Sequence, residues 1–304
     1  LLVTADRGVT AYQQRQQRAV ADPFDFTGID WLGRGREVSI AVSPRGFLDI
    51  RGLKPSEAQR NYLGLGQNAV PRTRPVGAVA SECDWPLEVW QNPITPDELF
   101  FAQNKLAGGS DVRTSAEFTD SNLLSDPTLD EYRVLHFATH GLVSAPRPGC
   151  PARPALVTSF GDSGSDGLLS FREIFDLKLD ADLVILSACD TAGMATVGAS
   201  REAGVTTGGN YALDGLVRAF VGAGARSVIA SHWPVPDDYD ATKRLIGALL
   251  DAAPGVPLAA ALEQAQAKLM DDPQTSHPFY WGAFIILGDG AKPLVPGTQV
   301  ASAE

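Results

Sequence analysis

The alternation of short apolar runs with amphipathic segments restricts the fold of this chain more than any other feature of its sequence. The apolar runs have the length of β-strands, and the segments between them carry apolar residues at helical spacing. The predicted strands are 37–42, 133–138, 183–188, 226–231 and 284–288, and the predicted helices are 96–107, 116–125, 170–176, 211–223, 239–252 and 257–271. Buried strands that alternate with helices form a mostly parallel sheet with helices on both faces, so we predict an α/β fold.

Two polar loops mark the expected position of a binding site. Residues 144–168 and 190–210 are rich in Gly, Pro, Ser and Thr, and each follows a predicted strand. In open α/β sheets, ligands bind outside the carboxyl ends of the strands. We therefore expect the functional site at this edge of the sheet.

The composition excludes some classes of partner. The chain has 304 residues, of which 44% are hydrophobic, so it is long enough to bury a sizeable core. Its 25 basic and 36 acidic residues give a net charge of −11, which argues against nucleic acid and favours a basic peptide or protein partner. No apolar run reaches the roughly 20 residues of a membrane span, so no membrane partner is expected.

The start of the chain and its cysteines indicate its context. The sequence opens with "LLVTADRGVTAYQQRQ", without a methionine or a secretory signal, which indicates a piece of a longer polypeptide. Three cysteines are too few and too unevenly spaced for a zinc ribbon or a disulfide framework, and this usage favours a cytoplasmic protein. Cys83 and Cys150 lie in Pro-rich loop sequences, where a bridge is compatible with the sequence but cannot be deduced from it.

A cysteine and a histidine end two of the predicted strands. "LVILSACDTAG" brings Cys189 to a strand end, and "VLHFATHG" does the same for His140. Each residue alone is typical of a packed core. Together they can face each other across the crevice, where an imidazole raises the small thiolate fraction of a thiol and later protonates a leaving amine. The backbone N–H groups of Cys189 and Gly141 could then point at a developing oxyanion.

Several longer blocks of sequence extend this pattern. They are "VLHFATHG", "GLLSFREIFDLKLDADLVILSACDTA", "LVRAFVGAGARSVIASHWPVPD" and "HPFYWGAFIILGD", preceded by "WLGRGREVSIAVSPRGFLDIR" and "NYLGLGQN". In this order they resemble the CHAT domain, a caspase-like peptidase module that is often carried behind tetratricopeptide repeats and is related to separase and the caspases. By this resemblance, residues 1–75 form the N-terminal part of the domain and residues 76–304 its caspase-like catalytic part. The family usually has a further strand and "PDG"-like sequence upstream, so its first elements are expected to be absent from this chain.

The resemblance implies roles for the strand-end residues. His140 would be the general base and Cys189 the nucleophile, 49 positions apart, with the histidine upstream as in caspases. The implied reaction is peptide-bond hydrolysis through a thioester acyl-enzyme, with no metal and no organic cofactor. The implied partners are a protein or peptide substrate and tetratricopeptide repeats upstream in the full-length chain.

His136 lies four residues before His140 and shares its strand face. A metal pair would need further ligands, but His232 and His277 lack ligand spacing. We therefore predict that His136 is a hydrogen-bonded core residue or supports the site from behind.

The segment "SVIASHWPVPDD" follows the fourth predicted strand and ends in acidic residues. In the related separases, an acidic residue after the equivalent strand reads a basic P1 side chain, and Asp237 and Asp238 match that region, with Asp190 as another candidate. Each acid taken singly is also compatible with a solvated loop, and Asp237 and Asp238 also with an N-cap of the next helix. Trp233 is predicted to line the substrate pocket.

Three glycine-containing runs, "GLGQN", "GVTTGGN" and "GAGARS", lack the spacing and the context of a nucleotide-binding loop. The second, residues 204–210, is better explained as a flap beside Cys189.

Two hypotheses for function remain. The first is a cysteine endopeptidase, with a preference for a basic P1 residue as a companion hypothesis. The second is a binding or signalling module with a caspase-like fold and an idle cysteine. A peptidase controlled by an attached sensor domain lies between the two.

Overall fold

The structure is a computed structural model whose described residues fall into two compact units. One unit comprises residues 1–51 and 235–304, and the other comprises residues 52–234. Within the chain, the described residues are 13–14, 24–41, 44–73, 82–106, 108–143, 145–151, 153–162, 165–187, 211–233, 235–236 and 238–294. These units follow the packing of the chain, and the sequence division at residue 75 stays a prediction.

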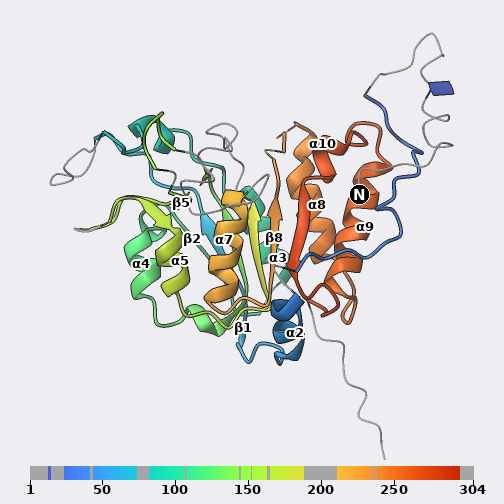
Figure 1. The fold of residues 1–304 in the computed structure, drawn as a ribbon, viewed down its shortest axis with the longest axis horizontal. Coiled ribbons are helices and arrows are strands. Elements are labelled where there is room, and N and C mark those ends of the chain that lie inside the picture. The colour runs from blue at the N-terminus through green and yellow to red at the C-terminus, as the bar shows by residue number, and fades with distance from the viewer. Residues whose placement is uncertain are drawn as a thin grey trace, which may run out of the picture. The chain divides into compact units, whose positions relative to one another are not determined.

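A parallel sheet forms the centre of the 52–234 unit (Figure 1). Its strands lie in the order β2 (Ser110–Thr114), β1 (Arg60–Gly66), β3 (Tyr132–Ala138), β7 (Leu183–Ser187) and β8 (Ser227–Ser231), and every neighbouring pair is parallel. All residues of β7 and β8 are buried, as expected for central strands covered on both faces. The predicted α/β fold with a mostly parallel sheet is confirmed.

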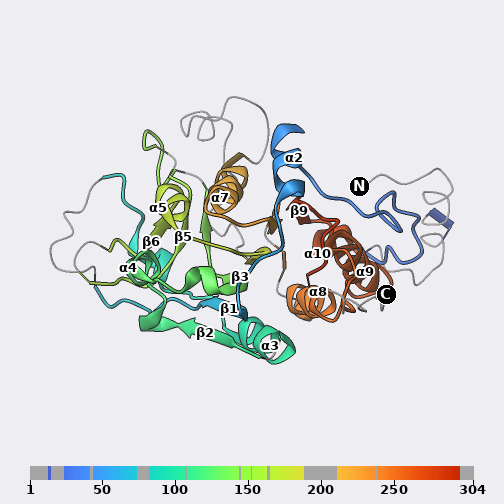
Figure 2. The ribbon, with the colours of Figure 1, turned by 90° about the horizontal axis from the view of Figure 1, so that it is seen from below.

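Helices cover both faces of this sheet (Figure 2). The helix α3 (Asp97–Leu106) packs on β1 with Leu99 and Ala102 buried, and α5 (Phe171–Asp176) and α7 (Tyr211–Gly222) lie on the opposite face. A capping box starts α5, because the Ser170 hydroxyl accepts the Glu173 N–H while the Glu173 carboxylate accepts the Ser170 N–H. This local signal explains why the helix is recognisable in the sequence.

A small antiparallel sheet lies after β3 in the chain. It consists of β4 (Gly141–Leu142), β5 (Ala155–Val157) and β6 (Leu168–Ser170), in that order. The same unit contains the helix α4 (Asp120–Ser125) and the 3₁₀ turns η1 (Leu87–Trp90), η2 (Ser115–Glu117) and η3 (Leu129–Glu131). The small sheet matters for the site because it begins one residue after His140.

The other unit is mainly helical. It contains most of α2 (Pro44–Gly52), together with η4 (Asp238–Asp240), α8 (Ala241–Leu250), α9 (Leu258–Met270), α10 (Pro278–Trp281) and the strand β9 (Phe284–Gly288). Its core includes the edge-to-face pair of Trp31 and Trp281, with ring centroids 5.6 Å apart. No helix in the described ranges is long and apolar enough to cross a membrane.

Several elements of the fold differ from the sequence prediction. The predicted strand at 37–42 is wrong, since among its described residues only Ile40 pairs, in a single bridge to Leu287. The elements β1, β2 and α2 were not predicted as a strand, a strand and a helix. In β1 the glycines interrupt the apolar pattern, but they are required: a Cβ at Gly66 would lie 2.3 Å from the Ala138 carbonyl oxygen.

Candidate active site

Two neighbouring parallel strands, β3 and β7, end at the same edge of the sheet. Their register pairs Ala138 with Ser187, the last residue of each strand. His140 follows Ala138 by two residues, and in the sequence Cys189 follows Ser187 by two residues. Cys189 and Asp190 lie outside the described residues, so the geometry of the site is built from the histidine side.

A backbone carbonyl holds the His140 ring. The side chain is 8% exposed, and its Nε2 lies 2.6 Å from the carbonyl oxygen of Asn92. A carbonyl can only accept, so Nε2 carries the hydrogen, and Nδ1 is the acceptor nitrogen of the neutral ring. A base whose far nitrogen is fixed by a third group has the arrangement that nucleophilic catalysis requires.

The backbone after His140 is fixed by the small sheet. The Val157 N–H donates to the His140 carbonyl at 2.9 Å, and the Thr139 hydroxyl donates to the Val157 carbonyl at 2.6 Å. In a planar trans peptide, the C=O and the following N–H point in opposite directions. The N–H of Gly141 therefore points away from β5, on the side where the ladder does not use it.

An aromatic cluster packs behind this turn. Leu142 lies in one buried cluster with Trp85, Trp90 and Val157. The Trp90 indole N–H lies 3.0 Å from the carbonyl of Thr158, which fixes the ring. A cavity of about 240 Å³, lined in part by Trp85 and Trp90, adjoins the cluster. The packed indoles thus support the backbone near Asn92 and His140. The adjoining cavity is large enough to admit a side chain of a ligand.

His136 is a buried core histidine with partners on both ring nitrogens. Its Nδ1 lies 3.0 Å from the Tyr62 hydroxyl, and its Nε2 lies 2.8 Å from Oε1 of Glu98 and 3.2 Å from the Ser187 hydroxyl. The Ser187 hydroxyl also donates to Glu98 at 2.6 Å. This network ties β1, β3, β7 and α3 together directly below the edge where His140 stands.

The protonation of the network follows from its chemistry. Burial, and next the negative charge of Glu98, raise the pKa of the Tyr62 phenol, so Tyr62 stays protonated and can donate to Nδ1 of His136. The Nε2 hydrogen then goes to the Glu98 carboxylate. Within the described ranges, no group of three or more His, Cys, Asp or Glu side chains is arranged to hold a metal ion.

Trp233 and Asp238, two further predicted site residues, belong to different units of the chain. Trp233 is half-buried two residues beyond β8 in the 52–234 unit, whereas Asp238 is exposed in η4 of the other unit. Asp237 lies outside the described residues. The N-cap explanation is wrong for Asp238, because α8 starts at Ala241 and Asp240 occupies the N-cap position in a left-handed conformation, with φ of 51°.

Sequence reasoning missed the partners of both histidines. The partner of His140 is the main chain of Asn92, and a backbone carbonyl leaves no trace in residue type. Glu98 was placed in a helix but carried no signal of its contact with His136 and Ser187. Glu98 lies in the first turn of α3, and its contact with the sheet depends on how α3 packs against β1 and β3.

Cys83 and Cys150 form a disulfide. Cys189 is therefore the one cysteine of the three outside that bond. Disulfides persist in oxidising compartments and are rare in the cytosol, so the bond gives no support to the cytoplasmic location, which stays a prediction.

Comparison with known families identifies the class of this protein. The CHAT domain family model matches residues 17–289. The chain therefore belongs to the CHAT domain family, which confirms the resemblance inferred from the sequence blocks.

The relatives found by sequence are much longer proteins. Tetratricopeptide repeat protein 28 of Homo sapiens is 31% identical over 209 residues, covering 58% of this chain and 8% of that protein. Its Mus musculus counterpart is 31% identical over 246 residues, covering 69% of this chain and 9% of that protein. The chain thus spans less than a tenth of the length of these relatives. Among solved structures, the Saccharomyces cerevisiae separase–securin complex aligns with a TM-score of 0.43 and 12% identity, over 80% of this chain and 13% of that chain.

Proposed function

We propose that this chain is a cysteine endopeptidase domain in which His140 is the general base and Cys189 the nucleophile. The observation that carries the proposal is the His140–Asn92 hydrogen bond, which orients a buried imidazole at the end of β3. The neighbouring strand β7 continues in sequence to Cys189 two residues later. Family membership supports the same pairing.

The reaction proceeds in two displacements. His140 Nδ1 takes the proton of the Cys189 thiol, and the thiolate sulfur forms a bond to the scissile carbonyl carbon. As the C–N bond breaks, the imidazolium gives its proton to the leaving amine, which leaves a thioester on Cys189. A water molecule, deprotonated by His140, then attacks the thioester carbon and releases the acid product and the thiol.

Backbone donors would stabilise the charge that develops on the carbonyl oxygen. The outward N–H of Gly141 supports this role, and the N–H of Cys189 is the proposed second donor. Such donors are usually the largest single contribution to acyl transfer, because they are fixed before the charge appears. Neither donor needs a metal ion or an organic cofactor.

A basic P1 preference remains the companion proposal. Asp190, Asp237 and Asp238 are the candidate acids, and Trp233 is the candidate wall of the pocket. The net charge of −11 supports attraction of basic segments in general.

A binding or signalling module is the second candidate function. It is favoured by the relatives, which are named for tetratricopeptide repeats and are more than ten times as long as the matched region. A domain of this size within such a chain can serve as a scaffold or wait for a signal from its neighbours.

The reactivity of Cys189 separates the two candidates. Under non-reducing conditions, Cys83 and Cys150 are bonded to each other, so iodoacetamide has one thiol to alkylate. We expect the alkylation rate of the folded chain at pH 6.5 to exceed that of the urea-unfolded chain by at least about 10-fold, because His140 stabilises the thiolate. His140→Ala should remove this excess, while His277→Asn, in the other unit, should keep it. Equal rates for the wild type and His140→Ala would contradict the proposed dyad.

A further inference from the structure

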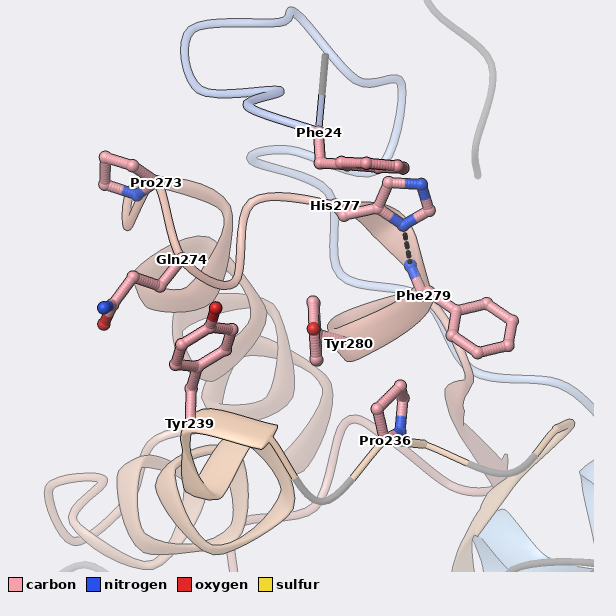
Figure 3. A pocket seen from close by; sticks show the side chains of 8 residues that line it. All are labelled: Phe24, Pro236, Tyr239, Pro273, Gln274, His277, Phe279 and Tyr280. Carbon is pink, nitrogen blue, oxygen red and sulfur yellow. Dashed lines mark hydrogen bonds between the residues drawn. The ribbon is translucent and has the colours of Figure 1, made fainter. Parts of the chain in front are cut away.

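A cleft of about 410 Å³ lies in the unit formed by the two ends of the chain (Figure 3). Its aromatic walls come from segments far apart in sequence, with Phe24 near the start of the chain, Tyr239 in η4, and Phe279 and Tyr280 in α10. Phe24, Tyr239 and Phe279 are 66%, 51% and 46% exposed. Large aromatic side chains that stay half-exposed around one hollow are typical of a binding surface.

Two tyrosines form the centre of this cleft. Figure 3 shows Tyr239 and Tyr280 side by side with crossed rings, and their centroids are 6.0 Å apart at an interplanar angle of 65°. The backbone of Tyr239 has a positive φ of 59°, and that of Asp240 one of 51°. Such conformations cost energy in residues other than glycine, so the surrounding fold holds Tyr239 in place rather than leaving it to a relaxed turn.

The polar groups of the two tyrosines are available to a ligand. Within the part of the chain that the structure describes, neither hydroxyl makes a hydrogen bond, and the Gln274 side chain lies beside Tyr239 (Figure 3). Hydroxyl and amide groups at the rim of an aromatic cleft can donate to the backbone carbonyls of an extended peptide.

A carboxylate lies next to the tyrosine pair, because Asp238 directly precedes Tyr239 in η4. Burial, and next the carboxylate of Asp238 and the neighbouring Tyr239, raise the pKa of the Tyr280 phenol, so the charge of Asp238 reaches the pair. His277 adds no positive charge near pH 7, because burial lowers the pKa of its ring. Its Nδ1 accepts the Phe279 N–H at 3.1 Å, as expected for a neutral imidazole. The cleft therefore combines aromatic ring faces with a nearby carboxylate, and the His277 imidazole that lines it adds no positive charge near pH 7.

We propose that this cleft binds an arginine side chain from an extended segment of a protein partner, with the guanidinium against Tyr239 and Tyr280 and close to Asp238. Arginine fits better than lysine because its planar, weakly hydrated cation stacks on aromatic rings and donates in several directions. The peptide residue next to the arginine would then pack against the rings of Phe24, His277 and Phe279. The net charge of −11 favours the approach of such a basic segment.

Isothermal titration of the full chain tests this site. The probe is a blocked pentapeptide with a central arginine between two leucines, and the matched control peptide carries citrulline, which keeps the shape and loses the charge. Both are titrated into the Cys189→Ala chain, so that neither cleavage nor its absence affects the result. We expect the arginine peptide to bind at least 5-fold more tightly than the citrulline peptide, and Tyr239→Ala and Asp238→Asn each to weaken the arginine peptide by at least 5-fold.

Control variants separate this cleft from other sites. Phe100→Ala removes an exposed aromatic side chain of the other unit and should bind within 2-fold of the parent chain. Trp233→Ala does not change the lining of the cleft, so any arginine-peptide affinity that this variant removes belongs to the predicted substrate pocket. Equal binding of the two peptides, or full binding by Tyr239→Ala, would overturn the proposal, and neither result would contradict the proposed dyad of His140 and Cys189.

Discussion

At the scale of single residues, His140 depends on a group that mutagenesis of side chains does not remove. Asn92 is exposed, and its backbone carbonyl accepts the hydrogen bond from the imidazole. An orienting carbonyl fixes the tautomer and the ring plane without adding a charge to the site. In the proposed mechanism, the Asn92 carbonyl thus orients the His140 ring through Nε2.

Because the His140 ring is held by a backbone carbonyl, we expect Asn92→Ala to leave the reactivity of Cys189 nearly unchanged. Alanine supplies the same backbone carbonyl, so iodoacetamide should alkylate Cys189 in this variant at a rate within about 2-fold of that in the wild type. His140→Ala, in contrast, should lose the excess of the folded-chain rate over the unfolded-chain rate. Iodoacetamide kinetics at pH 6.5 make the comparison. A loss as large as that of His140→Ala would mean that the side chain of Asn92, and not its main chain, serves the site.

Glu98 satisfies two buried donors, and its removal should destabilise the fold. Glu98→Ala leaves the His136 N–H and the Ser187 hydroxyl without their acceptor, at an expected cost of about 2–3 kcal/mol in the free energy of unfolding. Glu98→Gln keeps an acceptor oxygen and should cost roughly 1 kcal/mol. Urea unfolding measures both values. Equal stability of Glu98→Ala and the wild type would show that the network contributes nothing.

At the scale of elements, the strands that carry the proposed dyad could be predicted from sequence, but their supports could not. The apolar runs of β3 and β7 match their observed bounds to within one residue. In contrast, β1 is hidden by Gly64 and Gly66, whose small size is required by the close approach of Ala138 and Leu99. The edge strand β2 reads "SDVRT" and is half-buried throughout, so it has no apolar face to detect.

In the candidate site, too, some positions could be predicted from the sequence and others could not. The position of His140 and Gly141 just beyond the end of β3 was predictable from the sequence, whereas their catalytic roles stay a proposal. The Asn92 carbonyl, the Glu98 contacts and the cleft at Tyr239 and Tyr280 depend on segments distant in sequence. Such contacts are set by tertiary packing, which residue periodicity does not encode.

The disulfide joins the loop before η1 to the loop before β5. The two cysteines are 67 positions apart, and the segment between them runs from η1 through β3 to β4. A cross-link of this span restricts the unfolded chain, so the Cys83→Ser/Cys150→Ser variant should lose about 2–4 kcal/mol of stability under non-reducing conditions. Urea unfolding with and without a reductant gives the measurement. Coincident curves for the oxidised wild type and the double variant would contradict a stabilising role.

At the scale of the whole molecule, the chain is one CHAT domain that matches less than a tenth of its relatives. Its acidic surface charge and the proposed arginine cleft both favour basic partners. A peptidase domain with a separate docking cleft could choose its substrate by two contacts, one at the scissile bond and one at the cleft. A signalling module would use the cleft alone.

Cleavage of a peptide library by the purified chain is the direct test of the proposed dyad of His140 and Cys189. The library is incubated with wild type, Cys189→Ala and His140→Ala, and new amino termini are counted by mass spectrometry. The dyad predicts cleavage by the wild type alone, with both variants reduced by at least about 1,000-fold. Cleavage that persists unchanged in Cys189→Ala would contradict the account.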